Sequence, residues 1–182
     1  MITEEQKKTY LIYYNEIKEA IFDTYKYFYY LDYLKTNKET YRNQSAIKLF
    51  PKDLCDLLKK NICLNIYKIV IDDGSDALSL NLMKNFIHFN IDNNLRVRNV
   101  QIPTHLKDNI INIRNNMIAH NLNNQQSYSV SITQLKSILD KIAECFNALN
   151  IKDITKCDEH FTNNTLNRIE ELCECSIANF NI

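Results

Sequence analysis

The sequence predicts an all-α protein in which residues 1–182 form a single helical bundle. One glycine and two prolines are too few for the tight turns of a many-stranded fold. Apolar residues recur at spacings of three and four along most of the chain, as they do on one face of a helix. The chain is long enough to bury a core, and no change of composition marks a second domain. We therefore expect five to six helices in one domain.

We expect a helix wherever this apolar period is sustained. The segments that have it are about 3–34, 51–71, 78–91, 103–120, 131–149 and 158–178. Pro51 and Pro103 stand where the first turn of a helix accepts proline. The second segment ends before the single glycine, and the polar residues 91–101 are expected to form a loop.

The composition excludes several classes of protein. Lys and Arg together number 22, as do Asp and Glu, so the chain has no general attraction for phosphate groups. No run approaches the roughly 18 apolar residues that cross a membrane, and MITEEQKKTY does not resemble a signal peptide. We therefore expect a cytoplasmic protein that does not bind membranes, with its six cysteines reduced.

The stretch INIRNNMIAHN contains the residues of greatest chemical interest. Helical spacing places Arg114 inside an apolar arc roughly 160° wide, between Ile110 and Ile118. Arginine keeps its charge and is rarely buried alone. It can pair with a carboxylate such as Asp56 or Glu144 in a structural ion pair, extend to water, or face an anion in a crevice or subunit interface.

His120 stands at the end of the same helix, before an Asn-rich segment. It can be a capping side chain beside the negative end of the helix dipole. The near-neutral pKa of histidine also makes it the best candidate for proton transfer. In one ideal helix Arg114 and His120 point about 120° apart. They converge if the helix unwinds near Ala119, or if two chains share the site across a symmetric interface.

Arg114, Asn115, four further residues and His120 in a small all-α chain resemble the motif of HEPN-domain ribonucleases. The form is most similar to HEPN proteins of abortive infection and toxin–antitoxin systems, in which Ala before the His is usual. The resemblance is clearest over residues 46–122 and includes KKNICLNIYKI and LSLNLMKNF. It implies a HEPN-like bundle that forms a homodimer and takes RNA as its substrate.

The resemblance also implies catalytic roles for three residues. His120 deprotonates the ribose 2′-OH or protonates the leaving 5′ oxygen, and Arg114 holds the scissile phosphate. Asn115 orients the phosphate or the imidazole. The reaction needs no metal and no cofactor, and DNA is no substrate because it lacks the 2′-OH. An alternative is a catalytically inactive HEPN dimer that acts as a scaffold or regulatory partner.

Control of such a toxin by a cognate antitoxin protein is a further expectation. Some HEPN toxins are neutralised by modification of a Tyr two residues after the His. This chain has Leu122 there, so that route is not expected.

Two other groups of residues bear on RNA binding. Basic residues bracket the loop before the motif helix, with Asp92 and Asp108 opposing them: Lys84, Arg96, Arg98 and Lys107. This edge suits a structured RNA target. Tyrosines 25, 27, 29, 30 and 33 can stack on bases, but such a cluster more often forms a core or a dimer face.

A zinc site is not expected. Cys157, His160, Cys173 and Cys175 could in principle gather around a zinc ion, but they lack C-x2-C spacing. Cys173 and Cys175 are also two apart on a predicted helix and point to different faces.

Overall fold

Helices account for most of the described chain, and none of its residues lies in a strand. The computed structural model describes residues 2–37, 50–72, 74, 79–118, 130–157 and 160–178, with only the backbone at 50–53, 117, 118 and 178. Its elements are α1 (Glu4–Thr36), α3 (Phe50–Ile66), the π-helix η1 (Tyr67–Ile71), α4 (Leu80–Asn90), α5 (Thr104–Ile118), α6 (Ile132–Ala148), α7 (Lys152–Thr155) and α8 (Asn163–Ala178). The predicted all-α class is confirmed.

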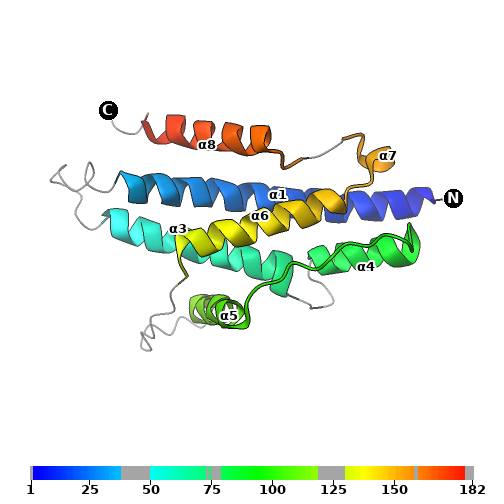
Figure 1. The fold of residues 1–182 in the computed structure, drawn as a ribbon, viewed down its shortest axis with the longest axis horizontal. Helices are drawn as coiled ribbons and strands as arrows, with labels where there is room; N and C mark the ends of the chain where they lie inside the picture. Colours follow the sequence, from blue (N-terminus) through cyan, green and yellow to red (C-terminus); the bar gives the residue numbers. More distant parts are fainter. Residues whose placement is uncertain are drawn as a thin grey trace.

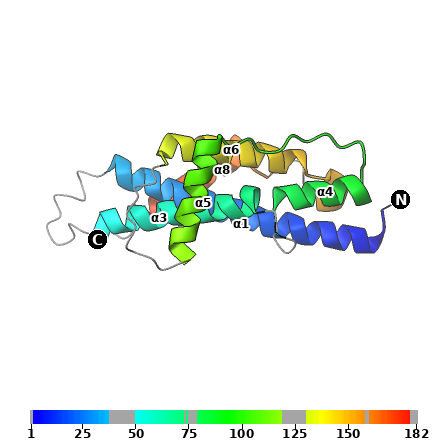
Figure 2. The ribbon, with the colours of Figure 1, turned by 90° about the horizontal axis from the view of Figure 1, so that it is seen from below.

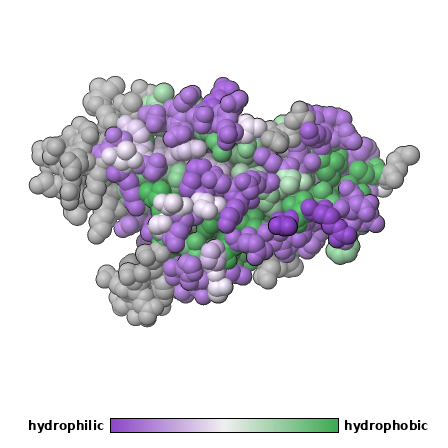
Figure 3. All heavy atoms as spheres, viewed as in Figure 1, coloured by the Kyte–Doolittle hydropathy of each residue, from purple (hydrophilic) through white to green (hydrophobic). Residues whose placement is uncertain are grey.

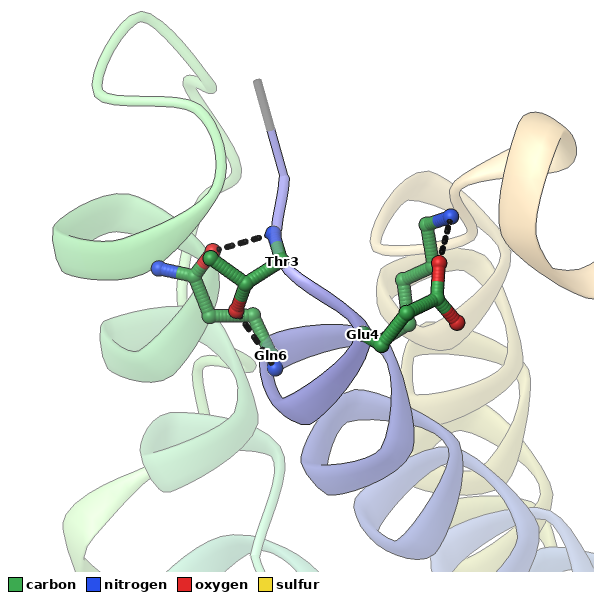
Figure 4. A network of polar contacts seen from close by, with 4 residues as sticks. Thr3, Glu4 and Gln6 are labelled. Carbon is green, nitrogen blue, oxygen red and sulfur yellow. Dashed lines mark hydrogen bonds and ion pairs between the residues drawn. The ribbon is translucent and has the colours of Figure 1, made fainter.

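Helix α1 begins at a capping box (Figure 4). The Thr3 hydroxyl accepts a hydrogen bond from the Gln6 N–H at 3.2 Å, and the Gln6 side chain accepts one from the Thr3 N–H at 2.8 Å. Glu4 lies in the first turn, where it interacts favourably with the helix dipole, and pairs with Lys7 at 2.6 Å. The polar residues that precede the apolar period therefore define where the helix starts.

The bundle is built around α1, which packs against α3, α4, α6 and α8. The axes of these helices are roughly aligned, with α8 on one side of α1 and α3 on the other (Figure 1). Helix α5 is the exception, because it lies across α3 on the outside of the bundle (Figure 2). The candidate site is therefore carried by an outer helix.

The core is formed by the apolar faces that the sequence predicts. Residues of α1 at spacings of three and four are buried: Tyr10, Tyr14, Ile17, Ile21, Tyr25, Phe28 and Leu31. Helix α6 contributes Leu135, Ile138, Leu139, Ile142 and Phe146. In the tyrosine cluster, Tyr25 and Tyr29 are buried, and the Tyr25 hydroxyl donates to Asp140 Oδ1 at 3.2 Å. These two tyrosines belong to the core and cannot stack on bases.

Two features differ from the sequence-based expectation. The second predicted helix is continuous to Ile71, but its last turn is the π-helix η1, closed by a 2.8 Å hydrogen bond from the Asp72 N–H to the Tyr67 carbonyl. The last helix begins at Asn163, not near Asp158, and the short α7 precedes it. The expected start was wrong because side chains outside the helix order this segment.

Asn147 is the main organiser of the segment between α6 and α8. Its Oδ1 accepts hydrogen bonds from the N–H groups of His160 and Phe161, each at 3.3 Å, and its Nδ2 donates to the Phe161 carbonyl at 3.2 Å. The Thr162 hydroxyl then accepts a hydrogen bond from the Thr165 N–H at 3.3 Å, as a helix N-cap does. The apolar period does not detect such contacts.

Hydrophilic residues cover most of the face drawn in Figure 3, and hydrophobic residues show between them. Although α1 has 33 residues, neither it nor another helix of the described chain has a stretch apolar enough to cross a membrane.

Tyr10 and Tyr14 give a matched test of this packing. The Tyr10 hydroxyl donates to the Leu149 carbonyl at 3.2 Å and accepts from the Ile151 N–H at 2.9 Å. The Tyr14 hydroxyl is buried without a hydrogen-bond partner among the described residues. We expect Tyr10→Phe to lower the free energy of unfolding by about 1–3 kcal/mol, and Tyr14→Phe to leave it unchanged or raise it by about 1 kcal/mol. Urea denaturation measures both, and equal losses would contradict this assignment.

Candidate functional site on helix α5

Helix α5 is attached to the bundle along one side. Leu106 and Ile110 are buried, 3% and 0% exposed, where the helix packs on α3 and η1. The Pro103 carbonyl accepts hydrogen bonds from the N–H groups of Leu106 and Lys107, both at 2.9 Å, so the helix starts where the sequence predicts. The side of α5 that faces away from α3 is not covered by another described helix (Figure 2).

Arg114 lies beside the buried side of α5 and is itself half-buried. About 40° separates it from Ile110 around the helix. Among the described residues of the expected apolar arc, Leu106 and Ile110 are buried, whereas Ile111 is only half-buried. Arg114 therefore stands at the edge of the packed surface, where its charged end can reach solvent.

Two contacts hold the Arg114 guanidinium. Its Cζ lies 4.9 Å from the centre of the Tyr67 ring, within the range of a cation–π interaction. Its Nη1 donates a 3.0 Å hydrogen bond to the Asn115 Oδ1. Tyr67 is the first residue of η1, so the π-helix supplies one wall of the site. The ring limits the positions that the guanidinium can take without neutralising its charge.

No carboxylate lies within ion-pair distance of Arg114 among the described residues. Asp56 and Glu144, the partners considered for a structural ion pair, are both exposed on their own helices and do not pair with it. The positive charge of Arg114 therefore remains available to an anion from outside the described chain.

The structure brings together two of the three predicted site residues. Arg114 and Asn115 are in contact, and Asn115 is exposed. His120 lies outside the described residues. The sequence pattern did not point to Tyr67, because in the sequence it is one of many apolar positions in the predicted helix 51–71. Its one distinguishing signal was its place in KKNICLNIYKI, within the stretch that resembles HEPN proteins.

The predicted basic edge runs along the connection between α4 and α5. Apolar and polar residues are interspersed in residues 95–102. The apolar ones pack against the core: Leu95, Val97, Val100 and Ile102. Arg96 and Arg98 are exposed between these apolar residues, and Lys107 is exposed at the start of α5. The Arg98 carbonyl accepts a weak hydrogen bond from the Cys145 thiol at 3.6 Å, which holds the segment against α6. A fixed segment thus carries two arginines to the start of the site helix.

The residues weighed for zinc do not come together as a set. Cys173 is buried, with its Sγ 3.9 Å from the Lys26 carbonyl, whereas Cys175 is exposed. Cys157 and His160 lie near each other, with 3.8 Å between Sγ and Nδ1. No group of three or more His, Cys, Asp or Glu side chains within the described residues could hold a metal ion.

No family model, curated protein or solved structure matches this chain. The side chains of the site nevertheless define a chemistry of their own. A guanidinium held by an aromatic ring and an amide presents fixed N–H donors, and such donors bind phosphate and other oxyanions. The neighbouring arginines add positive charge along one direction of approach.

The role of Arg114 can be separated from the stability of the fold. We expect Arg114→Met, which keeps an unbranched side chain, to change the free energy of unfolding by less than about 1 kcal/mol. Loss of a buried ion pair would instead cost about 3–5 kcal/mol. Ile110→Ala is the positive control and should cost about 2–5 kcal/mol. Urea denaturation compares the three chains, and a large loss in Arg114→Met would indicate a structural role.

Proposed function

We propose that this chain is a metal-independent endoribonuclease of the HEPN type that acts as a homodimer in bacterial defence, as a toxin or an abortive-infection protein. The observation that carries the proposal is the Arg114 guanidinium, held by Tyr67 and Asn115 without a carboxylate partner among the described residues. A guanidinium held in place at the edge of the packed surface, with its charge not neutralised, is well suited to bind an anionic ligand. A phosphodiester is such a ligand.

In the proposed reaction Arg114 binds the non-bridging oxygens of the scissile phosphate. It stabilises the additional negative charge of the pentacoordinate transition state, which is greater than that of the bound substrate. Asn115 holds the guanidinium in place through its Oδ1 and can donate to the phosphate through its amide N–H groups. His120 transfers the proton of the ribose 2′-OH or of the leaving 5′ oxygen. The products are a 2′,3′-cyclic phosphate and a 5′-OH.

The distribution of charge supports binding of a particular RNA over general binding. The formal net charge is zero, so affinity for polyphosphate chains is low away from the basic edge. Arg96, Arg98 and Lys107 lie along the path to α5 and form no ion pair among the described residues. An RNA whose backbone follows this path reaches Arg114 with several phosphates already bound.

Dimerisation is part of the proposal, because it places two copies of His120 beside one substrate. Helix α5 lies on the outside, and its far side has no covering helix in the described chain. A twofold axis beside α5 would bring two such helices together in an isologous interface. Each interface would then contain two arginines and two histidines, which supply both an acid and a base.

Cleavage of RNA in the presence of EDTA tests the proposal. We expect Arg114→Ala and His120→Ala each to lower the rate by about 10² or more while the far-ultraviolet circular dichroism stays unchanged. His105→Ala is the matched control, because it removes an exposed histidine from the same helix and should leave cleavage intact. Toxicity on expression should be lost in the same variants. A requirement for a divalent metal would refute the mechanism.

Substitutions of Tyr67 in the same cleavage assay test whether its ring positions Arg114. Tyr67→Phe keeps the aromatic face beneath the guanidinium and should keep most of the activity, whereas Tyr67→Leu should lower it about tenfold. Equal rates in the two variants would show that the ring does not position Arg114. A stable dimer that never cleaves RNA would support the alternative of an inactive HEPN-type scaffold.

The state of association is tested separately. We expect light scattering to give the mass of a dimer at tens of micromolar, the range in which an obligate dimer persists. Ile111→Glu should shift the mass toward the monomer, since Ile111 is half-buried beside Arg114 and the change introduces charge. Asn116→Ala, on the exposed side of α5, is the control. A monomer in the unaltered chain would contradict a shared active site.

A further inference from the structure

A second group of reactive side chains lies where the segment between α6 and α8 meets α1, on the side of the molecule away from α5 (Figure 1). The Cys157 Sγ is 3.8 Å from the His160 Nδ1. The imidazole packs on Tyr14, with 5.3 Å between ring centres, and Tyr14 stacks on Phe146 at 4.9 Å. A thiol, an imidazole and a phenol therefore meet at one place.

The Tyr14 hydroxyl is the unusual member of this group. Tyr14 is only 2% exposed, and its hydroxyl has no hydrogen-bond partner among the described residues. The Thr155 hydroxyl is near but donates to the Asn150 Oδ1 at 2.7 Å. Burial raises the pKa of Tyr14, and the nearby charges of Tyr10 and Cys157 raise it further, so the hydroxyl keeps its proton. The Tyr14 hydroxyl is thus a buried donor without an acceptor among the described residues, and Cys157 is close enough to influence its pKa.

His160 can act as a base here. Burial lowers its pKa, and the neighbouring Lys18 lowers it further, so the imidazole is neutral at pH 7. A neutral imidazole in contact with a thiol can accept its proton and leave the thiolate, which is the nucleophilic form of cysteine. Cys157 is half-buried, so a small reagent can reach it.

We propose that Cys157 is a peroxide-reactive modification site in which His160 accepts the thiol proton and the Tyr14 hydroxyl binds the oxygen transferred to sulfur. The proposal is independent of the ribonuclease function. Hydrogen peroxide is small and uncharged, and it supplies an oxygen atom that can accept a hydrogen bond. The product, a cysteine sulfenic acid, would give the Tyr14 hydroxyl the acceptor that it lacks in the reduced chain.

The thiol proton moves to His160, and the thiolate attacks one peroxide oxygen. An S–O bond forms, the O–O bond breaks, and two electrons pass from sulfur to peroxide. The leaving hydroxide takes the proton back from His160, which gives one sulfenic acid and one water.

Cys63, Cys145, Cys173 and Cys175 have no hydrogen bond to an imidazole among the described residues. Burial raises the pKa of Cys63 and of Cys145 to about 11, and it also raises the pKa of Cys173. Cys175 is exposed on α8, with no imidazole in contact among the described residues. It is therefore the internal control for simple accessibility.

The full-length protein is exposed to hydrogen peroxide, the sulfenic acid is trapped with dimedone, and each cysteine peptide is quantified by mass spectrometry. We expect Cys157 to be labelled at least about tenfold faster than Cys175. His160→Asn should lower the rate of labelling at Cys157 about tenfold. Tyr14→Phe, which keeps the ring and its packing, should lower the yield at Cys157 about threefold.

Equal labelling of Cys157 and Cys175 would overturn the proposal, as would no labelling of Cys157. A Cys157 rate unchanged in both variants would also overturn it, because accessibility alone would then explain the reaction. Thermal melting of each reduced variant establishes that the fold is intact. If His160→Asn unfolds the segment, Tyr14→Phe still decides the outcome, because its packing surface is retained.

Discussion

The buried stripe of α1 is the constraint on which the rest of the structure depends. Helices α3, α4, α6 and α8 all pack against it, so the stripe has to be broad and continuous over most of 33 residues. Tyrosines serve this purpose, because their rings fill the core while a hydroxyl at its edge can bind a polar group. The Tyr10 and Tyr25 hydroxyls do so with Leu149, Ile151 and Asp140. Helix α5 has no part in this stripe and remains outside.

A charge at the edge of a core needs support, and here an aromatic face provides it. The Tyr67 ring attracts the Arg114 guanidinium but does not neutralise its charge. A carboxylate partner would neutralise it. An ion pair would reduce the affinity of the arginine for a phosphate because the ligand would first have to displace the partner. The contact with the ring uses none of the guanidinium N–H donors, of which one is bonded to Asn115 Oδ1.

The elements that depend on local signals were predictable from the sequence. Thr3 and Ser131 each form a capping box at the start of an apolar period, so α1 and α6 begin within a residue of the expected positions. The contacts that depend on distant residues were not predictable. The start of α8 depends on hydrogen bonds from Asn147, whereas the apolar period carries information only about one helix at a time. The motif singles out Arg114 and Asn115 as candidates, but the Tyr67 contact joins residues 47 positions apart, which no spacing rule covers.

The hydrogen bonds of Tyr10 bear on how the chain folds as it is synthesised. They join α1 to residues 139 and 141 positions further along, and α8, later still, also packs on α1. The apolar stripe of α1 therefore stays partly uncovered until α6 and α8 have been synthesised. Folding is consequently late and cooperative, and an incomplete chain exposes the stripe to chaperones and proteases.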